Sequence, residues 1–106
     1  MEKQYHKLVR DRIPEIIAAT GQVCHTEIVT GEAYLQALDT KLGEELAEYR
    51  ESRSPEELAD LLEVLIAAAA AQGVSWEQLL AIREEKRQKR GGFEKGIFLL
   101  SVSDKE

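Results

Sequence analysis

The sequence has little cysteine, fewer basic than acidic residues, and no long apolar run. Cys24 is the only cysteine among 106 residues, so no disulfide can form within the chain and a reducing compartment is expected. Fourteen basic residues against twenty acidic ones leave a net charge of −6, which disfavours binding to extended nucleic acid. An acidic protein can still act on an acidic substrate when a metal cation lies between them.

The longest apolar stretch, residues 61–71, contains Glu63 and is too short to span a bilayer. Residues 1–6 lack the apolar core of a signal peptide. With 43% hydrophobic and 32% charged residues, the composition is that of an ordinary folded chain. We therefore expect one cytoplasmic domain over residues 1–106, with no membrane partner.

Helical periodicity dominates the middle of the chain. Apolar residues recur at helical spacing from Thr30 or Gly31 to about Arg50, which predicts a long helix. Residues 52–55 should interrupt it, because Ser54 is a good N-cap and proline suits the first position of the next helix. That second helix should end before Gly73. Two long helices joined by a tight turn lie antiparallel, so an all-α antiparallel bundle is the predicted fold.

Weaker signals flank this pair of helices. A short helix is expected between Asp11 and Gly21, and a further helix from Ser75 to about Arg90. Residues 22–29 and 97–102 contain β-branched residues in loosely alternating or apolar runs, so both read as extended. The two segments could pair as a small two-stranded ribbon.

Paired carboxylates mark the two central helices. Each helix carries two acids three residues apart, a spacing that places both on one helix face: Glu45 with Glu48, and Glu57 with Asp60. By helical geometry, one acid of each pair lies beside the apolar stripe of its helix. Carboxylates near a core need a compensating partner. Oxygen ligands without histidine or cysteine favour Mg²⁺, with Mn²⁺ as a substitute.

The spacing alone leaves a second interpretation open. Glutamate-rich helices are common on protein surfaces, and Glu57 also stands where a capping box needs a glutamate. In that interpretation the acids are solvated and hold no ion.

Longer motifs in the same order make a family resemblance visible. The chain carries KLVRDRIPE at residues 7–15, ExxE and ExxD at residues 45–48 and 57–60, and KRGGF at residues 89–93. It thereby resembles the MazG-like, all-α nucleoside triphosphate pyrophosphohydrolases, in the branch that begins with a KLVRDKIPE-like segment. The two acid pairs stand closer in sequence than in many members of that family.

The resemblance implies a magnesium-dependent enzyme that cleaves nucleotides between the α- and β-phosphates, releasing a nucleoside monophosphate and pyrophosphate. Broad activity on nucleotides would fit a house-cleaning role. Glu45, Glu48, Glu57 and Asp60 would hold Mg²⁺. Glu45 or the adjacent Glu44 would orient the attacking water or accept its proton. It also implies a homodimer or a higher homo-oligomer, and a second copy would complete a four-helix arrangement.

Two basic groups are candidate phosphate contacts. Related enzymes use cations near the end of the last helix, and the corresponding residues here are Lys86, Lys89 and Arg90. The alternative is that these cations only stabilise a helix C-terminus. The N-terminal motif supplies the second group: Lys7, Arg10 and Arg12.

Two other functions remain open at this point. One is a phosphoribosyl-ATP pyrophosphohydrolase of histidine synthesis, which shares the helical fold and the acid motif. The other is a non-catalytic helical interaction module with solvated acids.

Overall fold

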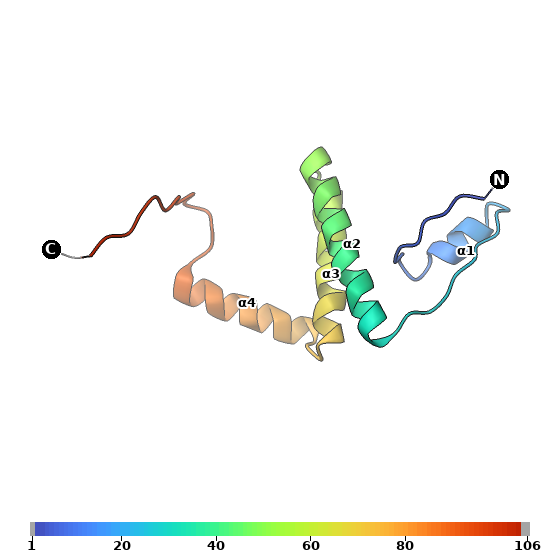
Figure 1. The fold of residues 1–106 in the computed structure, drawn as a ribbon. Coiled ribbons are helices and arrows are strands. Elements are labelled where there is room, and N and C mark those ends of the chain that lie inside the picture. Colours follow the sequence, from blue (N-terminus) through green and yellow to red (C-terminus); the bar gives the residue numbers. More distant parts are fainter. Residues whose placement is uncertain (1, 105–106) are drawn as a thin grey trace.

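The computed structural model describes residues 2–104 and contains four helices in that part of the chain (Figure 1). They are α1 (Ile13–Ala18), α2 (Gly31–Ser52), α3 (Pro55–Ala71) and α4 (Trp76–Arg90). The expected all-α fold is confirmed. The predicted ribbon is wrong: residues 22–29 and 97–102 are extended but unpaired, and no strand occurs within residues 2–104. Neither short segment has a neighbouring chain edge to pair with, and a lone extended segment gains no ladder hydrogen bonds.

Local signals account for the helix boundaries. Ser54 accepts a hydrogen bond from the backbone N–H of Glu57 at the start of α3. Ser75 and Gln78 form the complete capping box at the start of α4. Helix α2 extends two residues beyond the expected end, and Arg53 then closes it in the left-handed conformation at φ 55°, donating its N–H to the carbonyl of Tyr49. Arg53 and Ser54 form the two-residue turn that reverses the chain.

Helices α2 and α3 form an antiparallel hairpin, as predicted (Figure 1). Its small core is made of Leu38 from α2 with Val64 and Ala69 from α3. Gly73, at φ 79°, then allows a sharp change of direction, and α4 leaves α3 at a bend of 105°. Helix α4 therefore runs away from the hairpin rather than packing along it (Figure 1). The three principal helices do not close into a bundle within one chain.

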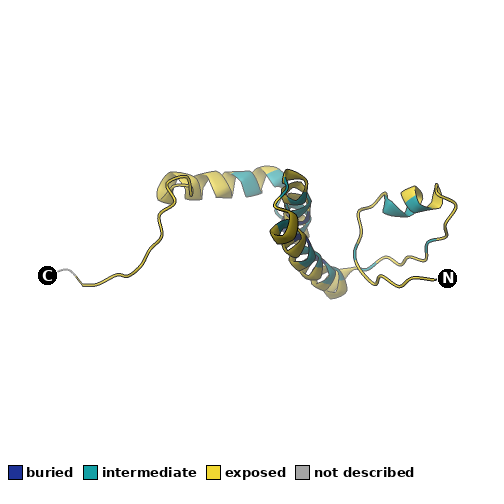
Figure 2. Cartoon of the chain, turned by 90° about the horizontal axis from the view of Figure 1, so that it is seen from above, coloured by how far each residue is buried: buried dark blue, intermediate teal, exposed yellow. Residues whose placement is uncertain are grey.

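The exposed surface shows how open this arrangement is. The radius of gyration is 19.0 Å, whereas a compact chain of this length has about 13 Å. The accessible surface is 9729 Å², against about 6,000 Å² for a compact monomer of this mass. Figure 2 shows most of α4 and all of residues 91–104 as exposed, while the part of α4 nearest α3 is intermediate. Much apolar surface is left uncovered, including Leu58, Leu62 and Leu65 on the outer face of α3.

Over residues 2–104, no single helix is both long enough and apolar enough to cross a membrane. Helices α3 and α4 meet those limits only as a pair, and that pair is sharply bent.

Candidate functional site

Three carboxylates from the two hairpin helices converge in the half of the hairpin nearest the turn. One oxygen each from Glu45 of α2 and from Glu57 and Asp60 of α3 lies within 4.8 Å of the other two. Antiparallel pairing brings this about, because the acids stand at similar distances from the turn on both helices. Two oxygens on opposite sides of one Mg²⁺ are about 4.2 Å apart, so the spacing suits a single shared cation. We refer to Glu45, Glu57 and Asp60 as the acid triad.

Glu45 is the most unusual member of the triad. It is 6% exposed and is the one buried charged residue within residues 2–104. Its Oε1 is 3.2 Å from Nζ of Lys41, but its Oε2 is buried without any hydrogen-bond partner. Oε2 of Glu57 is buried and unpartnered as well. Buried carboxylate oxygens without partners carry a large desolvation cost, which a bound cation would remove.

Burial and neighbouring charged groups shift the pKa values of two adjacent glutamates in opposite directions. Burial raises the pKa of the Glu45 carboxyl; the neighbouring Glu48 adds to that rise, and Lys41 opposes it. For Glu44, burial also acts upward, but hydrogen bonds from Lys7 and Lys41 outweigh it and lower the pKa. Burial acts to lower the pKa of Lys41, but its hydrogen bonds to Glu45 and Glu44 outweigh burial, so its pKa is raised.

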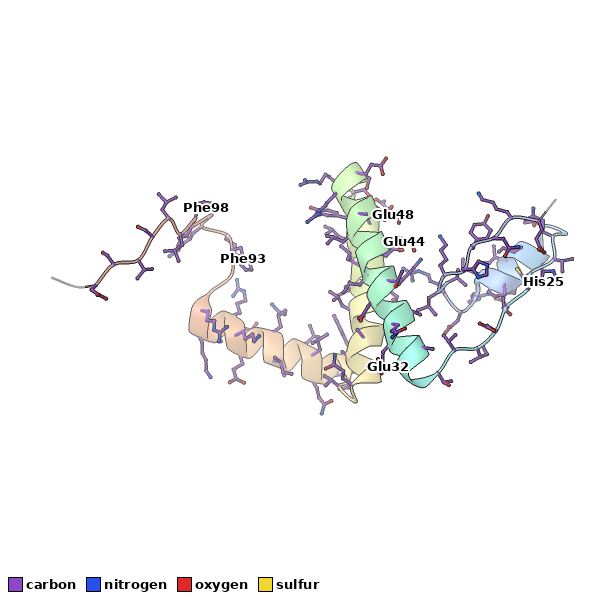
Figure 3. All side chains as sticks on the ribbon, in the orientation of Figure 1. His25, Glu32, Glu44, Glu48, Phe93 and Phe98 are labelled. Carbon is purple, nitrogen blue, oxygen red and sulfur yellow. The ribbon has the colours of Figure 1, made fainter. Side chains whose placement is uncertain are left out.

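Glu48, the fourth predicted metal ligand, lies outside the triad. Its side chain is exposed on α2, one turn beyond Glu45, and does not join the three converging oxygens. Figure 3 shows Glu44 and Glu48 along the same helix. Glu48 is therefore placed at the rim of the triad. Glu44, predicted beside Glu45 as a possible base, is half-buried and pairs with Lys7 at 3.1 Å and Lys41 at 3.3 Å.

The N-terminal motif reaches the acids with two of its three predicted cations. Nη2 of Arg10 lies 2.7 Å from Oδ1 of Asp60, and Nη1 lies 3.8 Å from Oε1 of Glu63. Lys7 approaches from the α2 side through Glu44. Arg12 turns elsewhere, because it pairs with Glu15 within its own helical turn at 2.6 Å.

The second predicted basic group lies far from the triad in the same chain. Lys86, Lys89 and Arg90 line a shallow hollow of about 230 Å³ with Ile82 and Glu85, at the far end of α4. Lys89 pairs with Glu85 at 2.9 Å, the ordinary helix pair of the alternative interpretation. Because α4 runs away from the hairpin (Figure 1), these cations can approach an acid triad only from another copy.

Lys41, which bridges Glu44 and Glu45, was not predicted from the sequence. A signal was present, because a lysine four residues before a glutamate faces it on a helix. The pattern Lys41-Leu42-Gly43-Glu44-Glu45 therefore predicted a cation beside both acids.

Comparisons with known proteins add little beyond this geometry. An uncharacterized protein of Mycolicibacterium smegmatis is 50% identical over 44 residues, which are 42% of this chain. The match spans 45% of that protein, so the chain covers under half the length of this relative. No protein-family model matches the chain, and no solved structure matches it significantly.

Proposed function

We propose that the chain is a magnesium-dependent nucleotide pyrophosphohydrolase of the MazG-like type. The observation that supports it most is the buried Glu45, whose unpartnered oxygen stands beside Glu57 and Asp60. A solvated acidic surface would leave these oxygens in water, where they need no cation. The all-oxygen ligand set favours Mg²⁺, with Mn²⁺ as a substitute.

In this proposal Glu45, Glu57 and Asp60 would hold the ion, with Glu48 at the rim. When bound, Mg²⁺ would neutralise phosphate charge and lower the pKa of a bound water. Either of the two adjacent glutamates, Glu45 or Glu44, would accept the proton of that water or orient it. Glu44, held ionised by two lysines, is suited to orienting a water through its free lone pairs.

The cations of the N-terminal motif have a role in the same proposal. Arg10 contacts Asp60, and Lys7 contacts Glu44, so both stand where phosphate oxygens would lie next to the triad. Both are partly exposed, so their ion pairs with the acids are weak and exchangeable. A triphosphate would offer them stronger, charge-assisted hydrogen bonds.

Self-association is the second element of the proposal. The chain exposes far more surface than a compact monomer, and Leu58, Leu62 and Leu65 leave α3 with an uncovered apolar side. A second copy that packs on this side would bury it and complete a four-helix arrangement around the triad. We propose a homodimer as the smallest functional unit.

The decisive experiment measures pyrophosphate release from a panel of nucleotides with Mg²⁺, for the wild type and for Asp60→Asn. Broad activity that depends on Mg²⁺ and is lost in the variant supports a house-cleaning hydrolase. Activity on phosphoribosyl-ATP alone would indicate the enzyme of histidine synthesis instead. Inactivity on every nucleotide would leave the helical interaction module as the better description.

A further inference from the structure

An open hollow of about 260 Å³ lies between the N-terminal segment and the first turns of α2. Residues 6–8 form one wall, and α2 forms the other with Ala33, Gln36, Ala37, Thr40, Lys41 and Glu44. We refer to it as the N-terminal cavity. It adjoins the acid triad, because Lys41 and Glu44 form its end and Lys41 also contacts Glu45.

The cavity and Glu45 lie on adjacent sides of α2, and Lys41 contacts both. Residues 33, 37, 41 and 44 are spaced by three or four and therefore share a helix face, which Gln36 and Thr40 flank. Ala37 precedes Glu45 by eight residues, a rise of about 12 Å along the helix. A ligand that extends along this face would reach from the cavity to the acids.

The chemistry of the walls changes along that path. Leu8, Ala33 and Ala37 offer small apolar surface. Gln36 and Thr40 offer uncharged donors and acceptors, and within residues 2–104 neither side chain makes a hydrogen bond. Lys7 and Lys41 supply positive charge at the end beside the triad. Along α2, small apolar and uncharged polar residues alternate from Ala33 to Thr40, and the charged residues Lys41 and Glu44 follow.

His6 adds an aromatic ring to the wall of the cavity. Its backbone has an uncommon conformation. Its φ of 47° lies in the left-handed region, and its Nε2 lies 2.8 Å from Oε1 of Gln4. Few residues other than glycine adopt this conformation, and those that do concentrate at binding sites. Histidine rings also stack on nucleobases.

We infer that the N-terminal cavity binds the nucleoside part of the substrate, an inference that rests on the proposed function. A nucleoside has a flat ring with polar edges and a sugar with hydroxyls, and its phosphates extend from one end. The walls present small apolar surface and uncharged polar groups in one part, and charged groups at the end beside the acid triad. The volume is slightly below the about 300–1,000 Å³ of whole small-molecule sites, which suits a pocket for part of a ligand.

The test fills the cavity and leaves the acids unchanged. Ala37→Leu places a larger side chain on the α2 wall, whereas Ala81→Leu makes the same change at an exposed position of α4. For the most active nucleoside triphosphate, Ala37→Leu should raise KM about tenfold or more, with kcat and the Mg²⁺ dependence retained. Ala81→Leu should leave KM unchanged. An unchanged KM in Ala37→Leu, with an active wild type, would overturn the inference.

Two further measurements separate a nucleoside pocket from a folding defect. Thr40→Val keeps the shape of an exposed side chain and removes its hydroxyl, so a raised KM there is not a packing effect. Inorganic tripolyphosphate, which lacks a nucleoside, should inhibit wild type and both cavity variants equally. Weaker inhibition in the cavity variants would mean that the cavity binds phosphate, and the inference would be wrong.

Failure of the proposed function gives a different result from failure of the inference. If the wild type releases no pyrophosphate from any nucleotide, the hydrolase proposal falls. Calorimetry with the four ribonucleoside monophosphates then tests the cavity directly. Binding that Ala37→Leu abolishes would retain the nucleoside pocket, and absence of binding would eliminate it.

Discussion

Lys41 and Glu45 face one another one turn apart on α2, with Nζ 3.2 Å from Oε1. The pair is nearly closed off from solvent on both sides, and the lysine also holds Glu44. In this arrangement Lys41 carries the only positive charge that contacts the buried carboxylate within residues 2–104. The stability of the metal-free protein therefore depends on the ammonium group of Lys41. In the proposed function, a divalent cation would bind close to this group.

Lys41→Met should destabilise the apo protein by about 1–3 kcal/mol, because it leaves Glu45 buried without a counter-ion. Methionine preserves the helix propensity and most of the side-chain length. Mg²⁺ should restore part of the loss, since it supplies positive charge to the same carboxylate. Thermal unfolding in EDTA and in Mg²⁺ measures both effects.

Lys89→Met is the matched control, because Lys89 also pairs with a glutamate four residues away but is exposed. An exposed pair contributes at most about 1 kcal/mol, so this variant should unfold close to the wild type. Equal losses in the two variants would show that Lys41 acts through general helix stability.

Mg²⁺ should raise the melting temperature of the wild type, because a ligand that binds only the folded state stabilises it by about 2.7 kcal/mol at a hundredfold excess over its Kd. Glu57→Gln should remove this rise, since Glu57 belongs to the acid triad. Glu48→Gln should only reduce it, because Glu48 stands at the rim. A complete loss in Glu48→Gln would restore Glu48 as a full ligand.

Glu44 and Glu45 should give opposite pH dependences of stability in EDTA. The folded pKa of Glu44 is lowered. Its contribution to stability is therefore present at pH values above the ordinary pKa of a glutamate, and it is lost as the pH falls through the folded pKa. The folded pKa of Glu45 is raised, so its contribution is present at low pH and is lost as the pH rises through the folded pKa.

The measurement is the free energy of unfolding from acid to neutral pH, for the wild type, Glu44→Gln and Glu45→Gln. It checks the sign of both pH dependences. The advantage of the wild type over Glu44→Gln should grow with pH. Its advantage over Glu45→Gln should shrink over the same range. Parallel curves for the two variants would contradict the assigned environments.

The sequence predicted those parts of the structure that depend on neighbouring residues. Ser54 and Ser75 determine helix starts through bonds three residues away, so their caps could be read directly. The hairpin followed from the shortness of the turn, and the hairpin in turn brought Glu45 toward Glu57 and Asp60.

The remaining features depend on contacts that no local pattern records. Arg10 meets Asp60 across fifty positions of the sequence. The departure of α4 depends on the backbone at Gly73, and neither helix periodicity nor capping gives that direction. The failed ribbon has the same origin, since residues 97–102 are carried away from the rest of the chain. Figure 3 shows Phe98 out beyond α4, on the opposite side of the hairpin from His25.

Leu62→Lys should dissociate the proposed homodimer. Leu62 lies on the outer face of α3 and is 43% exposed in the single chain, beside Leu58 and Leu65. A lysine there would place a charge in an apolar contact and lose the burial of the leucine. Sedimentation velocity should show a smaller species, whereas Ala81→Lys on α4 should leave the assembly unchanged. A monomeric wild type would refute the proposed assembly.

In the proposed homodimer, one active site draws on two copies of the chain. Asp60→Asn should lose turnover, because the triad loses a ligand. Arg90→Ala should also lose activity, by raising KM or lowering kcat, if Arg90 contacts phosphate. Within one chain these residues lie apart, since α4 carries Arg90 away from the hairpin (Figure 1). They can serve one site only if each copy contributes one of them.

Mixing the two variants distinguishes the possibilities. In a mixed dimer, one site combines the intact triad of one copy with the intact Arg90 of the other, while the second site carries both changes. Mixed samples that exchange subunits should therefore recover activity that neither variant has alone. If both residues served the same site from the same chain, every site would retain one defect and mixing would recover nothing. If Arg90→Ala alone matched the wild type, the basic end of α4 would have no phosphate role, and Arg90 would act only on the helix terminus.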